Sequence, residues 1–206
     1  MLALEDGRVQ VIDDKGKLLR SGSAESAATT SPLFVRSARG NFVLVGTKEG
    51  LTALDAMDLR PLGRVNVKND TPRGMLATID VDGDRNPEVV MITEQGQVFM
   101  IKADEGRTLW TADARHADMI AFADINRDGT LDLLMMAREG SAFALSGRDG
   151  TLLWKEEAGA IAANHAPAVR QRSIVVARTT SGSLVITSDT GSGGLKAVLF
   201  PTTTPH

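Results

Sequence analysis

Cysteine and tyrosine are absent from this 206-residue sequence, and aromatic residues make up only 4% of it. Without cysteine the chain cannot form disulfides, thiolate metal sites or a cysteine nucleophile. The scarcity of aromatic rings argues against a platform on which nucleic-acid bases would stack.

A basic surplus and long apolar runs are lacking too. The net charge is −3, so no basic field favours nucleic acid as a partner. No apolar run approaches the roughly 18 residues needed to cross a bilayer, so membrane insertion is not expected. Glu5 and Asp6 stand near the start of the sequence, which excludes a secretory signal there. The chain is then either cytosolic or a segment whose targeting signal is absent.

The sequence also contains no GxSxG, HExxH or glycine-rich phosphate loop. Each of these motifs places a nucleophile, a metal pair or a phosphate cradle. Their absence favours a non-enzymatic protein.

A repeat organises the chain. A glycine precedes an alternating apolar and polar segment five times, at intervals of 42 to 46 residues: Gly7, Gly50, Gly96, Gly140 and Gly182. Each repeat holds segments of five to seven residues separated by turn residues, without a helical period, which predicts an all-β fold.

Four short strands at a period near 44 are typical of a propeller blade. The sequence therefore predicts a β-propeller of four-stranded antiparallel blades, with about five blades in one domain. The blades are expected at residues 1–22, 31–66, 72–112, 116–158 and 165–200, with residues 21–31 as a loop between blades and 201–206 as a frayed tail. The first blade lacks room for its first strand, so the ring is either five-bladed and incomplete or part of a larger propeller in a longer chain.

Residues 124–132 (DINRDGTLD) carry the clearest chemical signal. Their oxygen-bearing side chains are Asp124, Asn126, Asp128 and Asp132, with Gly129 at the sixth position. Alternate oxygen ligands in a tight turn can converge on one point, and hard oxygens without cysteine or histidine favour Ca²⁺. Thr130 is expected to add a backbone carbonyl. A solvated acidic turn is the plainer alternative.

Residues 80–88 (DVDGDRNPE) repeat the pattern. The corresponding residues are Asp80, Asp82, Asp84, Asn86 and Glu88. Arg85 replaces the glycine at the sixth position, where a φ above 0° would strain a non-glycine residue. We therefore expect two Ca²⁺ sites, of which the Asp80 site is weaker or has its turn rearranged around Gly83.

These two loops resemble the calcium loops of FG-GAP/VCBS repeats, which occur in integrin α-subunits. The segments GQVFMIKADEGRTLW and GSAFALSGRDGTLLW resemble the propeller repeats of pyrroloquinoline-quinone (PQQ) enzymes and their non-enzymatic relatives. That second resemblance implies that Trp110 and Trp154 pack between blades. A quinoprotein dehydrogenase is disfavoured because the chain has only two tryptophans, both at this repeated position.

A second candidate site is a ligand-binding face opposite the acidic loops. It would contain residues just before the first strands of successive blades: Arg73, Arg115, His116, Asn164 and His165. Polar loop residues without a ligand would give the same pattern.

Taken together, these features favour a calcium-stabilised propeller that binds a protein or glycan outside the cytoplasm, as a periplasmic, secreted or surface protein. Weak sites built from few ligands suit the millimolar calcium found there. Two alternatives stay open: a carbohydrate-binding or carbohydrate-active propeller (a lectin or lyase), and an architectural part of a larger assembly protein.

Overall fold

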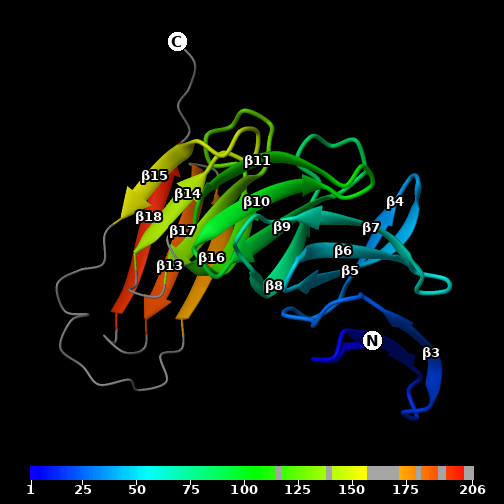
Figure 1. Ribbon diagram of the computed structural model, residues 1–206. Helices are drawn as coiled ribbons and strands as arrows, with labels where there is room; N and C mark the ends of the chain where they lie inside the picture. Colours follow the sequence, from blue (N-terminus) through cyan, green and yellow to red (C-terminus); the bar gives the residue numbers. More distant parts are fainter. Residues whose placement is uncertain (115–116, 138–140, 157–171, 180–181, 190–193, 202–206) are drawn as a thin grey trace. The chain divides into compact units, whose positions relative to one another are not determined.

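The computed structural model describes residues 1–114, 117–137, 141–156, 172–179, 182–189 and 194–201. Every regular element among these residues is a β-strand (Figure 1), which confirms the all-β prediction. The described residues form no helix of the length and apolarity that a membrane crossing needs.

The chain divides into two compact units, Met1–Ala114 and Arg115–His206. The first unit contains three antiparallel sheets. The first sheet has strands β1 (Leu2–Ala3), β2 (Arg8–Ile12) and β3 (Leu18–Ser23); the second has β4 (Leu33–Ser37), β5 (Gly40–Thr47), β6 (Gly50–Asp55) and β7 (Pro61–Asn66); the third has β8 (Pro72–Ile79), β9 (Glu88–Thr93), β10 (Gln97–Lys102) and β11 (Arg107–Asp113).

The second unit contains two further sheets. The fourth sheet has strands β12 (Ala117–Ala123), β13 (Asp132–Ala137), β14 (Ala142–Leu145) and β15 (Leu152–Glu156); the fifth has β16 (Arg172–Thr179), β17 (Gly182–Asp189) and β18 (Gly194–Pro201). Each sheet is a simple meander, because strands that are consecutive in sequence are hydrogen-bonded neighbours. The first sheet has three strands, as the sequence predicts.

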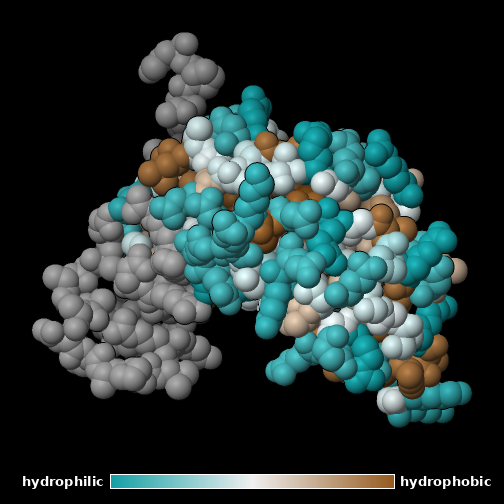
Figure 2. All heavy atoms as spheres, in the orientation of Figure 1, coloured by the Kyte–Doolittle hydropathy of each residue, from teal (hydrophilic) through white to brown (hydrophobic). Residues whose placement is uncertain are grey.

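The inner strands of the sheets are buried on both faces. Every residue of β9, β13 and β14 is buried, whereas β11 alternates between exposed and half-buried residues. A strand that is apolar on both faces is stable only when something covers each face of its sheet. Hydrophilic residues cover most of the described surface visible in Figure 2.

In the first unit the covering is done by neighbouring sheets. Alternate residues of β5 point to opposite faces: Val43 and Val45 pack with Val9 of the first sheet, and Leu44 packs with Met91 of the third sheet. Burying one such side chain contributes about 1.5–3 kcal/mol relative to leaving it exposed. These contacts make stacked sheets the basis of the core.

The pairing of the last two strands has an irregularity at the same place in four sheets. It falls between Val11 and Ile12, Ala53 and Leu54, Met100 and Ile101, and Ala144 and Leu145. A bulge of this kind adds a residue to one strand and increases the local twist. The repeat therefore extends beyond the sequence period to the register of the strands.

One sequence prediction needs correction. Residues 21–31 were expected to form a loop, but Ser21 and Ser23 belong to β3 and pair with Gln10 and Arg8. Strand pairing outweighs the weak β-propensity of serine and glycine at this position, since propensity in sheets depends on context.

Two glycines of the second sheet should respond differently to alanine. Gly50 has φ +133°, and a Cβ there would lie 2.1 Å from the Val65 carbonyl oxygen. Gly50→Ala is expected to lower the free energy of unfolding by about 1–3 kcal/mol, the usual cost of a forced backbone conformation. Urea denaturation followed by circular dichroism measures this loss.

Gly63→Ala is the matched control. Gly63 lies on β7, and nothing lies within 4 Å of a Cβ added there. Its alanine variant should unfold at the wild-type urea concentration or slightly above it, because alanine reduces the freedom of the unfolded chain. Equal losses in the two variants would contradict this account of Gly50.

Candidate metal centre

Two acidic loops connect the first and second strands of the third and fourth sheets. The first acidic loop (residues 80–88) joins β8 to β9, and the second acidic loop (residues 124–132) joins β12 to β13. Both therefore form the turn of a β-hairpin. Their last residues, Glu88 and Asp132, already belong to the following strands and are buried.

The ninth residue of each loop accepts a hydrogen bond from the second. The Val81 N–H donates to Glu88 Oε2 at 3.1 Å, and the Ile125 N–H donates to Asp132 Oδ2 at 2.9 Å. A buried carboxylate that receives a backbone donor is partly compensated for the loss of water. This bond fixes the end of each loop against its beginning.

The sixth residue of each loop donates to the first. The Arg85 N–H lies 3.2 Å from Asp80 Oδ2, and the Gly129 N–H lies 3.2 Å from Asp124 Oδ2. The third and fifth residues accept in the same way in both loops: Asp82 and Asp84 receive the Asp84 and Asn86 N–H groups, and Asn126 and Asp128 receive the Asp128 and Thr130 N–H groups. The two loops thus share one hydrogen-bond scheme.

The backbone conformations of the two acidic loops agree as well. The fourth and sixth residues have positive φ in both loops: Gly83 at 74° and Arg85 at 66° in the first, Arg127 at 64° and Gly129 at 84° in the second. Of the two outcomes expected for this loop, the rearranged turn is not found, because Arg85 adopts the left-handed conformation itself; the weaker site stays a prediction. The strain of a non-glycine residue is present in both loops, at the sixth position in one and at the fourth in the other.

Three carboxylates of the first acidic loop can hold a metal ion. Asp80, Asp82 and Glu88 each offer one oxygen, and these oxygens lie within 4.8 Å of one another. Asp80 Oδ1 and Glu88 Oε1 are buried and have no hydrogen-bond partner among the described residues. Buried oxygens normally find a donor or a cation, so these two fit a metal ligand role.

An amino group from the neighbouring strand competes for the same place. Lys102 Nζ lies 2.8 Å from Asp84 Oδ2 and 3.7 Å from both Asp82 Oδ2 and Glu88 Oε1. Its hydrogen bond lowers the pKa of Asp84, and in turn the pKa of Lys102 is raised. The first acidic loop thus carries its own cation.

In the second acidic loop a serine occupies the position that corresponds to Lys102. Lys102 pairs with Glu88 across β9 and β10, and by the register of β13 and β14 the corresponding residue there is Ser146. Asn126 stands in place of Asp82, so this loop has one carboxylate fewer. Arg148 Nη2 lies 3.5 Å from Thr130 Oγ1 of this loop.

Burial changes the acidity of the ninth residues. Desolvation raises the pKa of Glu88 above its ordinary value of 4.5 and raises the pKa of Asp132 as well. A carboxylate held in this way is costly to ionise until a cation compensates its charge.

The predicted ligand-binding face is only partly described. Arg73 lies on β8, and its Nε donates to the Thr93 carbonyl at 3.0 Å. The other four residues of this face lie outside the described residues: Arg115, His116, Asn164 and His165. Its role stays a prediction.

Sequence reasoning did not anticipate the position of Lys102. The signal was present, because counting outward from the turn between β9 and β10 places Lys102 opposite Glu88. A search for acidic ligands alone passes over a cation supplied by the adjacent strand.

In EDTA, Glu88→Gln should remove a pH-dependent loss of stability. Because the folded carboxyl keeps its proton above pH 4.5 while the unfolded one releases it, the free energy of unfolding falls as pH rises through the raised pKa. The difference between variant and wild type, measured by urea denaturation, should therefore grow in the variant's favour from pH 4.5 upward. Glu94→Gln, the same substitution at an exposed residue of the turn between β9 and β10, is the matched reference variant. A flat difference for Glu88→Gln would contradict the prediction.

The sequence matches one family model, described as outer membrane protein assembly factor BamB, over residues 5–203. No curated protein sequence matches the chain. Among solved structures, BamB from Moraxella catarrhalis is similar with a TM-score of 0.62 and 19% identity, covering 97% of this chain and 54% of that one. The computationally designed protein Ika8 gives 0.58 and 18%, covering 95% and 53%. BBS1N, crystallised in complex with ARL6DN, gives 0.59 and 11%, covering 95% and 62%.

These similarities establish the fold as a β-propeller and confirm the PQQ-like repeat. The chain spans roughly half the length of the first two structures. Since the family model covers all but a few residues at each end, the chain belongs to the family of the outer membrane protein assembly factor BamB.

Proposed function

We propose that this chain is a non-enzymatic, extracytoplasmic propeller that binds another protein and is stabilised by Ca²⁺ in its acidic loops. The observation that carries the calcium proposal is the shared scheme of the two loops. Two segments of different sequence place the same hydrogen bonds, the same positive φ angles and a buried ninth carboxylate at equivalent points. A solvated turn has no need of a carboxylate that is desolvated in this way.

In the second acidic loop the ligands would be side-chain oxygens of Asp124, Asn126 and Asp128, the Thr130 carbonyl and Asp132. In the first they would be Asp80, Asp82, Asp84, the Asn86 carbonyl and Glu88. The Asn86 side chain is already engaged, since its Oδ1 accepts from the Ala38 N–H at 2.8 Å. This leaves its backbone carbonyl for the ion, the role that Thr130 has in the other loop.

The interaction role is supported by the family. Its name describes an assembly factor for outer membrane proteins, and the similar BBS1N structure contains a second protein, ARL6DN. An outer-membrane assembly factor works outside the cytoplasm, where calcium sites of modest affinity are filled. The resemblance of the acidic loops to FG-GAP/VCBS repeats is part of the same proposal.

A thermal melt in millimolar Ca²⁺ against EDTA tests the calcium role. A ligand that binds only the native state adds about 2.7 kcal/mol at 100 times its Kd. For a chain of this size, each kcal/mol moves the midpoint by about 2–4 °C. The wild type should therefore melt several degrees higher with calcium, and Asp124→Ala should lose most of that difference.

Asp149→Ala is the control for this melt. Asp149 lies in the turn between β14 and β15, where its Oδ1 accepts from the Thr151 N–H at 3.0 Å. It therefore resembles the aspartates of the two acidic loops without belonging to either of them. This variant should keep the full calcium response. Identical melts of the wild type with and without calcium would refute the calcium role.

Lys102→Gln should strengthen calcium binding by the first acidic loop. The substitution removes the ammonium that neutralises Asp82, Asp84 and Glu88, so their charge becomes available to the ion. We expect at least a tenfold gain in affinity at this loop, equivalent to about 1.4 kcal/mol. Isothermal titration should detect a second calcium site where the wild type shows mainly one.

Lys48→Gln provides the comparison, because Lys48 is exposed and lies in the turn between β5 and β6. It should bind calcium as the wild type does. Unchanged titrations for Lys102→Gln would mean that Lys102 does not compete with the ion.

A further inference from the structure

The four irregular strand pairs define one equivalent position in each of four sheets. In each sheet we take the last regular pair before the irregularity and name its residue on the outer strand. These residues are Arg20 in β3, Gly63 in β7, Trp110 in β11 and Trp154 in β15. The chain therefore places tryptophan at this position twice, and glycine once.

Trp154 shows what a side chain does there. It packs against the buried cluster that contains Ala123 and Ala144 of its own sheet, and Ile174 and Val176 of the fifth sheet pack against the same cluster. The ring thus belongs to the apolar contact between the fourth sheet and the fifth, within the second unit.

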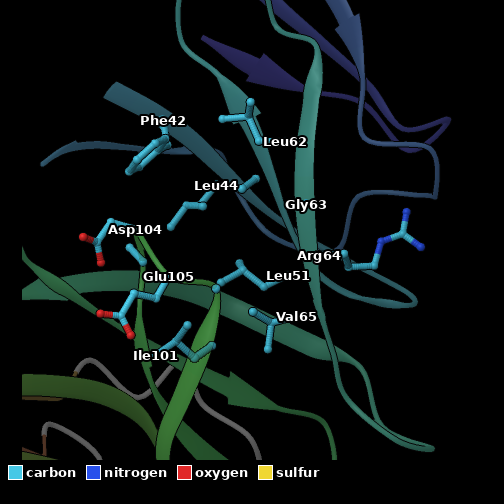
Figure 3. Close-up of a pocket in the computed structure, with 13 residues that line it drawn as sticks. Phe42, Leu44, Leu51, Leu62, Gly63, Arg64, Val65, Ile101, Asp104 and Glu105 are labelled. Carbon is cyan, nitrogen blue, oxygen red and sulfur yellow. The ribbon is translucent and has the colours of Figure 1, made fainter. Parts of the chain in front are cut away.

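At Gly63 the corresponding position is open. A Cβ built on Gly63 meets no atom within 4 Å. A cavity of about 170 Å³ lies beside it, lined by β5, β6 and β7 of the second sheet and by the end of β10 and the turn before β11 in the third (Figure 3). Its position between one sheet and the next corresponds to the contact to which Trp154 belongs.

The walls of this cavity combine apolar groups with carboxylates. Phe42, Leu44, Leu51, Val65 and Ile101 supply the apolar surface. In Figure 3 the carboxylates of Asp104 and Glu105 lie on one side and the β7 residues Leu62 and Gly63 on the other. An aromatic ring needs such an apolar surface for its faces.

Asp104 is the most unusual of these residues. Its side chain is 4% exposed, and its Oδ2 lies 3.3 Å from Arg39 Nε. Its Oδ1 is buried without a hydrogen-bond partner among the described residues. A buried acceptor in this state favours a ligand that brings its own donor.

Arg64, the basic residue of β7, does not pair with the carboxylates of the cavity. Arg64 directs its guanidinium away from Asp104 (Figure 3) and pairs instead with Glu25 and Glu49. Both carboxylates of the wall are paired with arginines from outside β7, Asp104 with Arg39 and Glu105 with Arg107 at 2.9 Å, so the wall suits a neutral ring better than an ion.

We propose that this cavity binds the indole ring of a tryptophan presented by another polypeptide. An apolar cavity of about 150 Å³ is sufficient to bind benzene, so the space is adequate for a ring inserted from an open side. The indole N–H would supply the donor that Asp104 lacks. Both tryptophans of this sequence lie in β11 and β15, away from the cavity lining, so neither of them is the occupant.

This inference adds the chemistry of the partner to the proposed interaction role, but it does not depend on calcium. The cavity is formed by β5, β6, β7 and the turn between β10 and β11, outside both acidic loops. Failure of the calcium melt would leave it intact, and its own failure would leave the calcium role intact.

Saturation-transfer NMR with N-acetyl-tryptophanamide as the probe tests the proposal at constant calcium. We expect transfer to the indole protons with the wild type, and weaker transfer to N-acetyl-phenylalaninamide, which has no ring N–H. Gly63→Trp should fill the cavity from within, reduce probe binding at least tenfold and raise the melting midpoint. Gly63→Leu, with a smaller side chain at the same point, is the second variant in case the first folds poorly.

Leu19→Trp is the control, because Leu19 lies exposed on β3, the outer strand of the first sheet. It adds a tryptophan to an outer strand without touching the cavity and should bind the probe as the wild type does. Absence of transfer with the wild type, or transfer that persists in both Gly63 variants, would overturn the proposal. Equal binding of the phenylalanine probe would overturn the part assigned to Asp104.

Discussion

The structure depends on the need to cover both faces of every inner strand. β9, β13 and β14 are buried throughout, so none of their sheets could be stable alone. In the first unit, Val43 and Leu44 illustrate the solution, because neighbours in β5 pack against different sheets. The fold is held together chiefly by contacts between sheets, and any gap in those contacts is a possible binding site.

The same constraint links the acidic loops to the core. Each loop ends on a residue that is already part of an inner strand, so its ninth carboxylate is buried because the strand is buried. The backbone N–H groups of Val81 and Ile125 reduce the cost but do not remove it, as the raised pKa values of Glu88 and Asp132 indicate. Charge that is desolvated by the fold is therefore available for a cation, whether an ion or the ammonium group of Lys102.

Much of this architecture could be predicted from the sequence. The spacing of glycines and alternating segments predicts the sheets, and the oxygen pattern predicts which hairpins carry acidic loops. Lys102 and Gly63 were not identified as site residues, because their importance arises from strand register and from packing between sheets, neither of which is visible in a local pattern. The same reason explains Ser21 and Ser23, whose polar character indicates a loop while pairing with β2 makes them a strand.

The exchange of glycine and arginine between the two acidic loops bears on how such loops are recognised in other sequences. Gly83 and Arg85 in one loop correspond to Arg127 and Gly129 in the other, yet all four residues have positive φ. A search pattern that demands glycine at the sixth position would find the second loop and miss the first. A pattern that accepts glycine at either the fourth or the sixth position would find both, and would describe the shape that the backbone must adopt rather than the residue that most often adopts it.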